Sequence, residues 1–217
     1  MSITDSTALM NRIYRHQRLV YDPTRKYFLL GRDRLIERLQ PRDGHKVLEL
    51  GCGTGRNLIL AARRYPKARF FGLDVSTEML TSAIDAIARA GFAARVRVTH
   101  ADAGGFNPCE LFGTKRFDRI FISYSLSMVP RWEGVLEHAV GMLEPDGELH
   151  IVDFGGQEGL PRWFRHLLRQ WLALFEVTPR DRLEATLTAL AQRHGATLTL
   201  ERPFRGYAQH AILRRAA

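Results

Sequence analysis

The residues best suited to bind a ligand follow three short apolar runs in the middle of the chain. The run at 47–50 enters a Gly-Cys-Gly-Thr-Gly turn at residues 51–55, and Asp74 and Asp102 follow the next two runs. Glycines let a ligand approach the backbone without a Cβ in the way, and a helix that begins after such a turn offers free N–H groups to an anion. Asp74 can accept both hydroxyls of a ribose, and Asp102 can accept the amino group of an adenine. These residues predict a nucleoside-binding site.

The spacing of this turn disfavours two other nucleotide sites. A dinucleotide-binding turn carries a third glycine or alanine three residues after Gly53, where this chain has Arg56. A phosphate loop continues as Gly-Lys-Ser or Gly-Lys-Thr, whereas Gly55 is followed here by Arg56 and Asn57.

These ligand-binding residues require a parallel sheet to position them. β-rich runs at 46–50, 69–73, 95–100, 118–123 and 148–153 alternate with helical patterns at 56–65, 76–90 and 132–143, which is typical of an α/β fold. Helices are then predicted at 162–175 and 182–194, followed by an antiparallel hairpin of 197–202 and 207–214. Residues 1–45 contain no predicted strand, so we expect an N-terminal helical cap at 1–45 on a core domain at 46–217.

Length and composition limit the class of protein. The chain has 217 residues, of which 45% are hydrophobic and 25% charged, as in one globular domain and not in a disordered or fibrous chain. No apolar run approaches the roughly 18 residues of a membrane span, and the Arg-rich start lacks the apolar stretch of a signal peptide. Cys52 and Cys109 have no partner pattern, so we expect a cytoplasmic protein without disulfides or a cysteine zinc site.

The net charge of +9 is concentrated at the two ends of the chain. Residues 1–46 carry 10 basic and 5 acidic side chains, residues 47–160 carry 12 and 14, and residues 161–217 carry 10 and 4. A basic surface indicates an anionic partner such as nucleic acid, acidic lipid or an acidic substrate. Charge alone does not distinguish these from simple solubility.

Residues 40–215 resemble the class I S-adenosylmethionine-dependent methyltransferases. The likeness rests on the glycine turn and the two aspartates, on Phe-Asp-Arg-Ile-Phe at 117–121, and on Leu-Glu-Pro-Asp-Gly-Glu-Leu at 143–149. The resemblance implies a Rossmann-like α/β fold with a seven-stranded, mostly parallel sheet in the order 3-2-1-4-5-7-6, whose last strand is antiparallel. It also implies S-adenosyl-L-methionine as the cofactor.

The same resemblance assigns a cofactor site to this chain. Residues at the end of the first strand would surround the methionine part, and Glu49 would orient its amine. Asp74 would bind the ribose and residues 102–103 the adenine, whose ring Val75 and Met79 would flank. The complete set that the resemblance implies is Glu49, Gly51, Cys52, Gly53, Asn57, Asp74, Val75, Met79, Asp102, Ala103 and Ser123, the last of these near the sulfonium.

Further motifs are similar to the bacterial betaine-lipid methyltransferases, which convert diacylglyceryl-homoserine to its N-trimethyl form. They are the Tyr-Asp…Arg…Leu-Leu-Gly-Arg pattern within 14–33, Ser-Tyr-Ser-Leu-Ser-Met at 123–128, and Val-Asp-Phe-Gly at 152–155. The likeness to bacterial phospholipid N-methyltransferases is looser. The resemblance implies an amino-lipid substrate, and therefore an enzyme that associates peripherally with the inner face of an anionic membrane.

This substrate gives specific side chains a chemical role. Aromatic rings stabilise a quaternary ammonium by about 0.5–2 kcal/mol each through cation–π contacts, and the candidate catalytic residues of this kind are Tyr14, Tyr21 and Tyr124. The headgroup carboxylate would pair with Arg25 or Arg32. Asp153, at the tip of the fifth strand, is predicted either to cap the backbone or to contact the substrate.

Residues 162–172 have the composition of a helix that lies on a membrane surface. A helix there would place Phe164, Leu168, Trp171 and Phe175 on one face and three arginines, Arg162, Arg165 and Arg169, on another. The alternative is an ordinary amphipathic helix that packs on the sheet.

Several functions remain open at this stage. A phosphatidylethanolamine methyltransferase and a soluble methyltransferase of a quinone or an amino acid are alternatives within the enzyme class. A nucleic-acid methyltransferase is disfavoured because the chain has no Asn/Asp-Pro-Pro-aromatic motif, and a non-enzymatic binding module is disfavoured by the complete glycine turn. We expect no metal site, because Glu133, Glu137 and His138 are more simply a solvated helix face.

Overall fold

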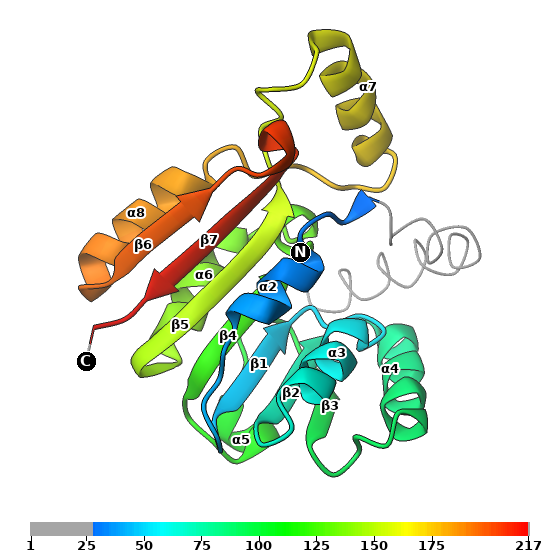
Figure 1. Ribbon diagram of the computed structural model, residues 1–217, viewed down its shortest axis with the longest axis vertical. Coiled ribbons are helices and arrows are strands. Elements are labelled where there is room, and N and C mark those ends of the chain that lie inside the picture. Colours follow the sequence, from blue (N-terminus) through cyan, green and yellow to red (C-terminus); the bar gives the residue numbers. More distant parts are fainter. Residues whose placement is uncertain (1–27, 217) are drawn as a thin grey trace.

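The computed structural model describes residues 28–216, and its centre is a sheet of seven strands in the order β3-β2-β1-β4-β5-β7-β6 (Figure 1). The strands are β1 Lys46–Leu50, β2 Arg69–Asp74, β3 Val96–His100, β4 Phe117–Ser123, β5 Leu143–Phe154, β6 Thr197–Glu201 and β7 Ala208–Arg214. The first five strands pair in parallel, and β7 pairs antiparallel with both β5 and β6. The predicted fold and strand order are confirmed.

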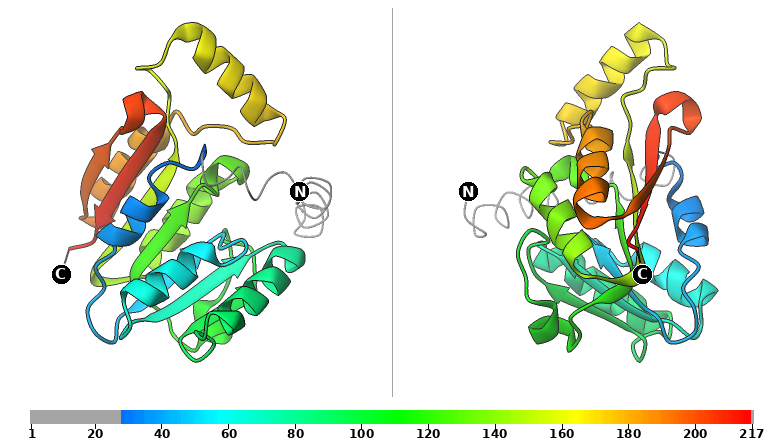
Figure 2. Two further views of the ribbon diagram at one scale, coloured as in Figure 1. Left: turned by 45° about the vertical axis from the view of Figure 1, so that its right-hand side comes forward. Right: turned by 90° about the vertical axis from the view of Figure 1, so that its left-hand side faces the viewer.

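Helices cover both faces of this sheet, as the edge-on view in Figure 2 shows. On one face lie α2 Arg32–Arg38, α3 Arg56–Arg64 and α4 Thr77–Arg89, and on the other lie α5 Pro108–Phe112, α6 Trp132–Gly141 and α8 Leu183–His194. Strand residues alternate between the two cores: Val47 faces the first, and Leu48 and Leu50 face the second. Helix α7, Arg162–Ala173, projects beyond the sheet and packs on the first core.

Local sequence accounts for where several elements begin. Helix α4 starts after Ser76, whose hydroxyl accepts a hydrogen bond from the backbone N–H of Met79, as expected of a capping serine. The short α5 was not predicted, although Asn107 caps it and Pro108 occupies its first turn. Strand β5 begins at Leu143, five residues before the predicted run, because Leu143 pairs with Phe117 across a register irregularity.

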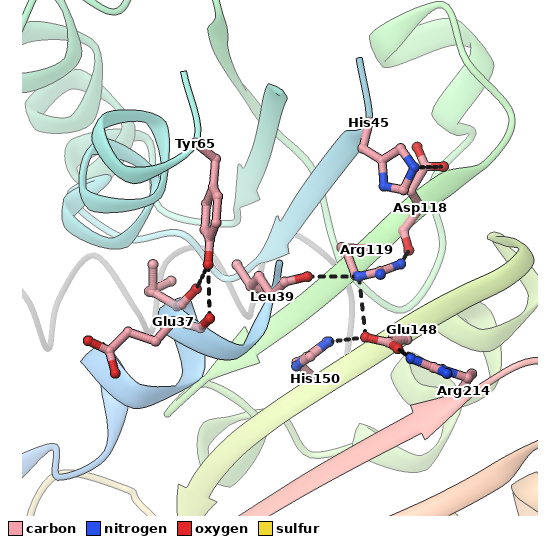
Figure 3. A network of polar contacts seen from close by, with 10 residues as sticks. Glu37, Leu39, His45, Tyr65, Asp118, Arg119, Glu148, His150 and Arg214 are labelled. Carbon is pink, nitrogen blue, oxygen red and sulfur yellow. Dashed lines mark hydrogen bonds and ion pairs between the residues drawn. The ribbon is translucent and has the colours of Figure 1, made fainter. Parts of the chain in front are cut away.

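The described N-terminal residues belong to the same core as the sheet. Leu35, Ile36 and Leu39 are fully buried against it. The C-terminal end of α2 is tied down by two side chains from the core (Figure 3): Tyr65 donates its hydroxyl hydrogen to the carbonyl of Ile36 at 3.0 Å, and Arg119 Nε donates to that of Leu39 at 2.8 Å. The division at residue 45 therefore remains a prediction.

Candidate functional site

A cavity of about 520 Å³ lies at the carboxyl ends of β1, β2 and β4, where the sequence analysis places the ligand. It is lined by predicted site residues from three strands and by loops that follow them. The predicted residues on its wall are Arg32, Glu49, Gly51, Cys52, Gly53, Asn57, Asp74, Val75, Asp102, Ala103, Ser123 and Tyr124. Residues that are far apart in the sequence are thus brought together at one edge of the sheet.

At its first glycine, the turn after β1 lies closer to a neighbouring side chain than a Cβ would permit. Gly51 has φ +74°, and a Cβ there would come within 2.6 Å of the Cβ of Ser125. The N–H groups of Gly51 and Cys52 both donate to the carbonyl of Leu73 at 2.9 Å, which fixes the turn against β2. Around Gly53, by contrast, a Cβ would meet no atom within 4 Å, so this glycine leaves open space for a ligand.

Glu49 is the most unusual carboxylate in the cavity wall. It is 1% exposed, and its Oε1 accepts a hydrogen bond from Asn57 Nδ2 at 2.8 Å. Its Oε2 is buried and has no hydrogen-bond partner among the residues that the structure describes. Burial raises the pKa of Glu49 to about 8, against the opposing effect of the Asn57 hydrogen bond. An ammonium group in the cavity would supply the missing partner, so the site fits a ligand with a primary amine.

Asp74 and Asp102 line the cavity and already accept hydrogen bonds from backbone N–H groups. Asp74 uses both of its oxygens for this, and Asp102 uses one. Asp74 accepts from Gly53 at 2.8 Å and from Ser76 at 2.9 Å, and Asp102 accepts from Gly104 at 2.8 Å. A carboxylate has about four acceptor positions, so these contacts fix the side chains and leave capacity for the hydroxyls of a ribose. Val75 lies on the wall as expected, whereas Met79 is 6% exposed and is not among the lining residues.

Tyr124 also lines the cavity, and its hydroxyl is already engaged. It donates to the carbonyl of Leu30 at 2.6 Å, while the Tyr207 hydroxyl donates to that of Phe28 at 2.9 Å. These two bonds anchor residues 28–31, so that Leu29 and Arg32 reach the cavity wall. The hydroxyl of Tyr124 thus ties the N-terminal residues to the sheet, and the predicted role of its ring toward an ammonium remains a prediction.

Asp153 does not reach the cavity. Its side chain is 0% exposed and accepts hydrogen bonds from the N–H of Ser127 at 3.1 Å and of Phe154 at 2.8 Å. Burial raises its pKa to about 6. Asp153 therefore caps the backbone, as one of its two predicted roles requires. The other predicted role, a contact with the substrate, is wrong because the side chain is buried away from the cavity.

Three of the predicted residues, Tyr14, Tyr21 and Arg25, lie outside the residues that the structure describes. The cavity wall also includes residues that were not predicted as site residues, namely Leu29, Leu50, Thr54, Arg56, Leu73, Ala101, Gly104, Gly105, Ser125, Leu126, Met128, Val129, Pro130, Arg131, Gly134 and Val135. Half of these follow β4, and a loop after a parallel strand must cross the ligand-binding edge, so that signal was available. Among residues 28–216, no group of three or more His, Cys, Asp or Glu side chains is placed to hold a metal ion.

Helix α7 presents a different apolar surface from the predicted one. Leu168 and Leu172 are buried in the core, and the ring of Trp171 lies 4.9 Å from that of Phe28. The exposed apolar residues are Trp163 at 66%, Leu167 at 55%, Leu174 at 75% and Phe164 at 38%. Arg169 forms an ion pair with Asp181 at 2.8 Å and is therefore occupied within the fold.

The exposed residues Trp163, Leu167 and Leu174 are spaced so that they share one side of α7 and of the turn after it. We call these three residues the α7 stripe. No helix within residues 28–216 combines the length and the apolar character needed to span a bilayer.

Comparison with known proteins shows what the domain resembles. Residues 47–147 match a family model described as "Methyltransferase domain". The chain is 34% identical over 121 residues to the methyltransferase GfsG of Streptomyces halstedii, and 32% identical over 117 residues to the trans-aconitate 2-methyltransferase of Enterobacter sp. (strain 638). These matches cover 56% and 54% of this chain but only 42% of each relative. The chain therefore matches less than half the length of these curated relatives.

Solved structures agree on the fold. A geranyl diphosphate methyltransferase in complex with GPP and sinefungin has a TM-score of 0.65 at 17% identity, over 85% of this chain and 76% of that one. The methyltransferase SibL in its apo form has a TM-score of 0.69 at 20% identity, over 93% of this chain and 59% of that one. Residues 47–147 thus match a methyltransferase domain, and the chain has the Rossmann-like fold of these solved methyltransferases. The candidate site lies at the glycine turn within the matched residues.

Proposed function

We propose that this chain transfers a methyl group from S-adenosylmethionine to the amine of a diacylglyceryl-homoserine-type lipid headgroup at the inner face of a membrane. The observation that carries the proposal is a single cavity whose wall includes both carboxylates and an arginine, Arg32, in a molecule that also exposes the α7 stripe. The carboxylates suit the cofactor, and the arginine suits an acidic acceptor.

The cofactor is assigned to the carboxylate side. The unpartnered Oε2 of Glu49 accepts the ammonium of the methionine part, and the open space over Gly53 accepts its main chain. Asp74 binds the ribose hydroxyls, and Val75 with residues 102–103 borders the adenine. S-Adenosylmethionine supplies an electrophilic methyl group on a sulfonium. The protein's part is to position the two reactants and exclude water.

The acceptor approaches from the side of Tyr124 and Arg32. The amine lone pair forms the new N–C bond while the S–C bond breaks, which leaves S-adenosylhomocysteine and an ammonium. No histidine or lysine is found among the described residues that line the cavity. We assign the ammonium proton to solvent. Arg32 is on the wall and can pair with the headgroup carboxylate. Tyr14, Tyr21 and Arg25 remain candidates for the same acceptor site.

The membrane contact is assigned to the α7 stripe. Trp and Leu side chains on a surface helix enter the boundary between headgroups and acyl chains, and neighbouring arginines are attracted to anionic lipid. Arg162 and Arg165 flank the stripe, while Arg169 is occupied by Asp181. We therefore assign the electrostatic attraction to the first two arginines.

A second candidate is methylation of a small soluble carboxylic acid. It is favoured by the similarity to a trans-aconitate 2-methyltransferase and by Arg32, Arg56 and Arg131, which all line the cavity. A carboxylate acceptor is already ionised at neutral pH and needs no general base.

The two candidates are separated by presenting both acceptors to one enzyme. S-Adenosylmethionine is supplied with diacylglyceryl-homoserine in anionic vesicles or with soluble tricarboxylic acids, and product mass is read for additions of one, two or three methyl groups. The amino-lipid proposal predicts a methylated headgroup. Methyl esters of the soluble acids, with no lipid product, would contradict it and support the second candidate.

The membrane assignment has its own test. Trp163→Ala combined with Leu167→Ala should reduce co-sedimentation with anionic vesicles several-fold, since these side chains are exposed and their loss leaves the core intact. Ile84→Ala removes another exposed apolar side chain, on α4, and is the control for a general loss of exposed apolar surface. Unchanged co-sedimentation of the double variant would remove the α7 stripe from this role.

A further inference from the structure

The segment after β4 forms part of the cavity wall. Four of its residues, Ser125, Leu126, Met128 and Val129, line the cavity, and Leu126–Met128 form a single turn of 3₁₀ helix. The chain enters this segment at Tyr124 with φ +56°, which is an uncommon conformation for a bulky residue. A short turn of this kind needs support from outside if it is to keep one shape.

That support comes largely from one side chain that is distant in the sequence. The guanidinium of Arg180 donates to three carbonyls of the segment: Nε to Leu126 at 3.0 Å, and Nη2 to Ser127 at 3.3 Å and Val129 at 2.7 Å. The planar fork of arginine suits such multiple donation. Its carbon Cζ also lies 5.9 Å from the ring centroid of Trp132, which begins α6.

Asp153 binds the same segment from the sheet side. It accepts the N–H of Ser127, whose carbonyl is bound by Arg180 and by the N–H of Thr178 at 2.9 Å. The peptide units around Ser127 are therefore fixed by groups from β5 and from the linker between α7 and α8. None of these three supporting residues lines the cavity.

We propose that Arg180 is a positioning residue that, together with Asp153, sets the shape of the 125–129 cavity wall for the incoming acceptor. The inference does not depend on which acceptor is used. It gives a function to two charged groups that the proposed reaction leaves unexplained. Because Arg180 lies in the linker that follows α7, and Arg169 of α7 pairs with Asp181 beside it, the wall is also connected to the α7 stripe.

Amide hydrogen exchange of the ligand-free protein tests this directly. Arg180→Met keeps the length of the side chain and removes the donors, and it should speed exchange in residues 126–129 by at least tenfold while leaving β1 protected. Arg182→Met, an exposed arginine two residues away, is the matched control and should exchange like the wild type. Equal protection of residues 126–129 in Arg180→Met and in the wild type would overturn the proposal.

Binding and kinetics separate positioning from a general loss of structure. In Arg180→Met, affinity for S-adenosylmethionine by calorimetry should change less than threefold, while the KM for whichever acceptor proves active rises at least tenfold. A loss of cofactor affinity in Arg180→Met that parallels the rise in acceptor KM would show that Arg180 is only structural.

Discussion

Two buried glutamates at opposite edges of the sheet differ in almost every respect except burial. Glu148 lies at the amino-terminal edge, where Arg119 Nε at 3.3 Å, His150 Nε2 at 2.9 Å and Arg214 Nε at 2.7 Å surround it (Figure 3). Glu49 lies at the carboxyl edge with one neutral partner, Asn57, and one oxygen unpartnered. The pKa of Glu148 is lowered to about 2 by its hydrogen bonds and cationic neighbours, against the effect of its burial, while burial raises that of Glu49 to about 8.

The difference separates a carboxylate that serves the fold from one that serves a ligand. A buried charge is stable when its partners belong to the same molecule, as at Glu148. A buried carboxylate that lacks a partner destabilises the protein, and such groups gather at functional sites. The same substitution, glutamate to glutamine, should therefore have opposite effects at the two positions.

The largest expected effect is at the amino-terminal edge. Glu148→Gln leaves the buried Arg119 without its counter-charge, which should lower the free energy of unfolding by about 3–5 kcal/mol. In a chain of this size that lowers Tm by about 6–20 °C. Because the folded pKa of Glu148 is depressed, its contribution is present above the unfolded value near 4.5 and is lost as pH falls toward about 2. In thermal melts, the Tm difference between the wild type and Glu148→Gln should therefore be larger at pH 7 than at pH 3.

Sequence reasoning was most accurate where the cause was local. The glycine turn, the serine cap of α4 and the alternating runs predicted the sheet and the part of the cavity wall at the strand ends, because hydrophobic period and turn chemistry depend on neighbouring residues. Asp153 and Arg180 could not be assigned in this way, since their roles arise from packing between segments more than 25 residues apart. The exposed apolar face of α7 differs from the predicted face for the same reason. The helix is apolar over a wide arc of its surface, and only packing against the core decides which side is buried.

The next largest effect is an increase in stability, expected for Glu49→Gln in the cavity wall. The raised folded pKa of Glu49 means that its stabilising contribution is complete below the unfolded value near 4.5 and is lost as pH rises through about 8. Glu49→Gln removes the charge that burial disfavours, so the ligand-free variant should be more stable than the wild type at pH 8 by about 1–3 kcal/mol. At pH 5 the two should melt together. A lower Tm for this variant at pH 8 would mean that Glu49 supports the fold, as Glu148 does.

The smallest effect is expected at Tyr124, which both stabilises the fold and lines the cavity. Tyr124→Phe removes one hydrogen bond, to the carbonyl of Leu30, and should reduce stability by only about 0.5–1.5 kcal/mol. Since that bond anchors residues 28–31 beside the cavity, acceptor KM should rise more than cofactor affinity falls. Unaltered stability and kinetics would leave the ring of Tyr124 as a packing group only.

The account depends most on one contact, between the unpartnered Oε2 of Glu49 and the ammonium of S-adenosylmethionine. The number of protons exchanged when the cofactor binds tests this contact most directly. Glu49 is mostly protonated at pH 7 when the cavity is empty, and an ammonium beside it favours the ionised form. Calorimetric titration with S-adenosylmethionine at pH 7, in buffers of different ionisation enthalpy, should therefore show release of close to one proton. Affinity should rise with pH up to about 8, and Glu49→Gln should abolish the release. Tight binding with no proton released from the wild type would contradict the account.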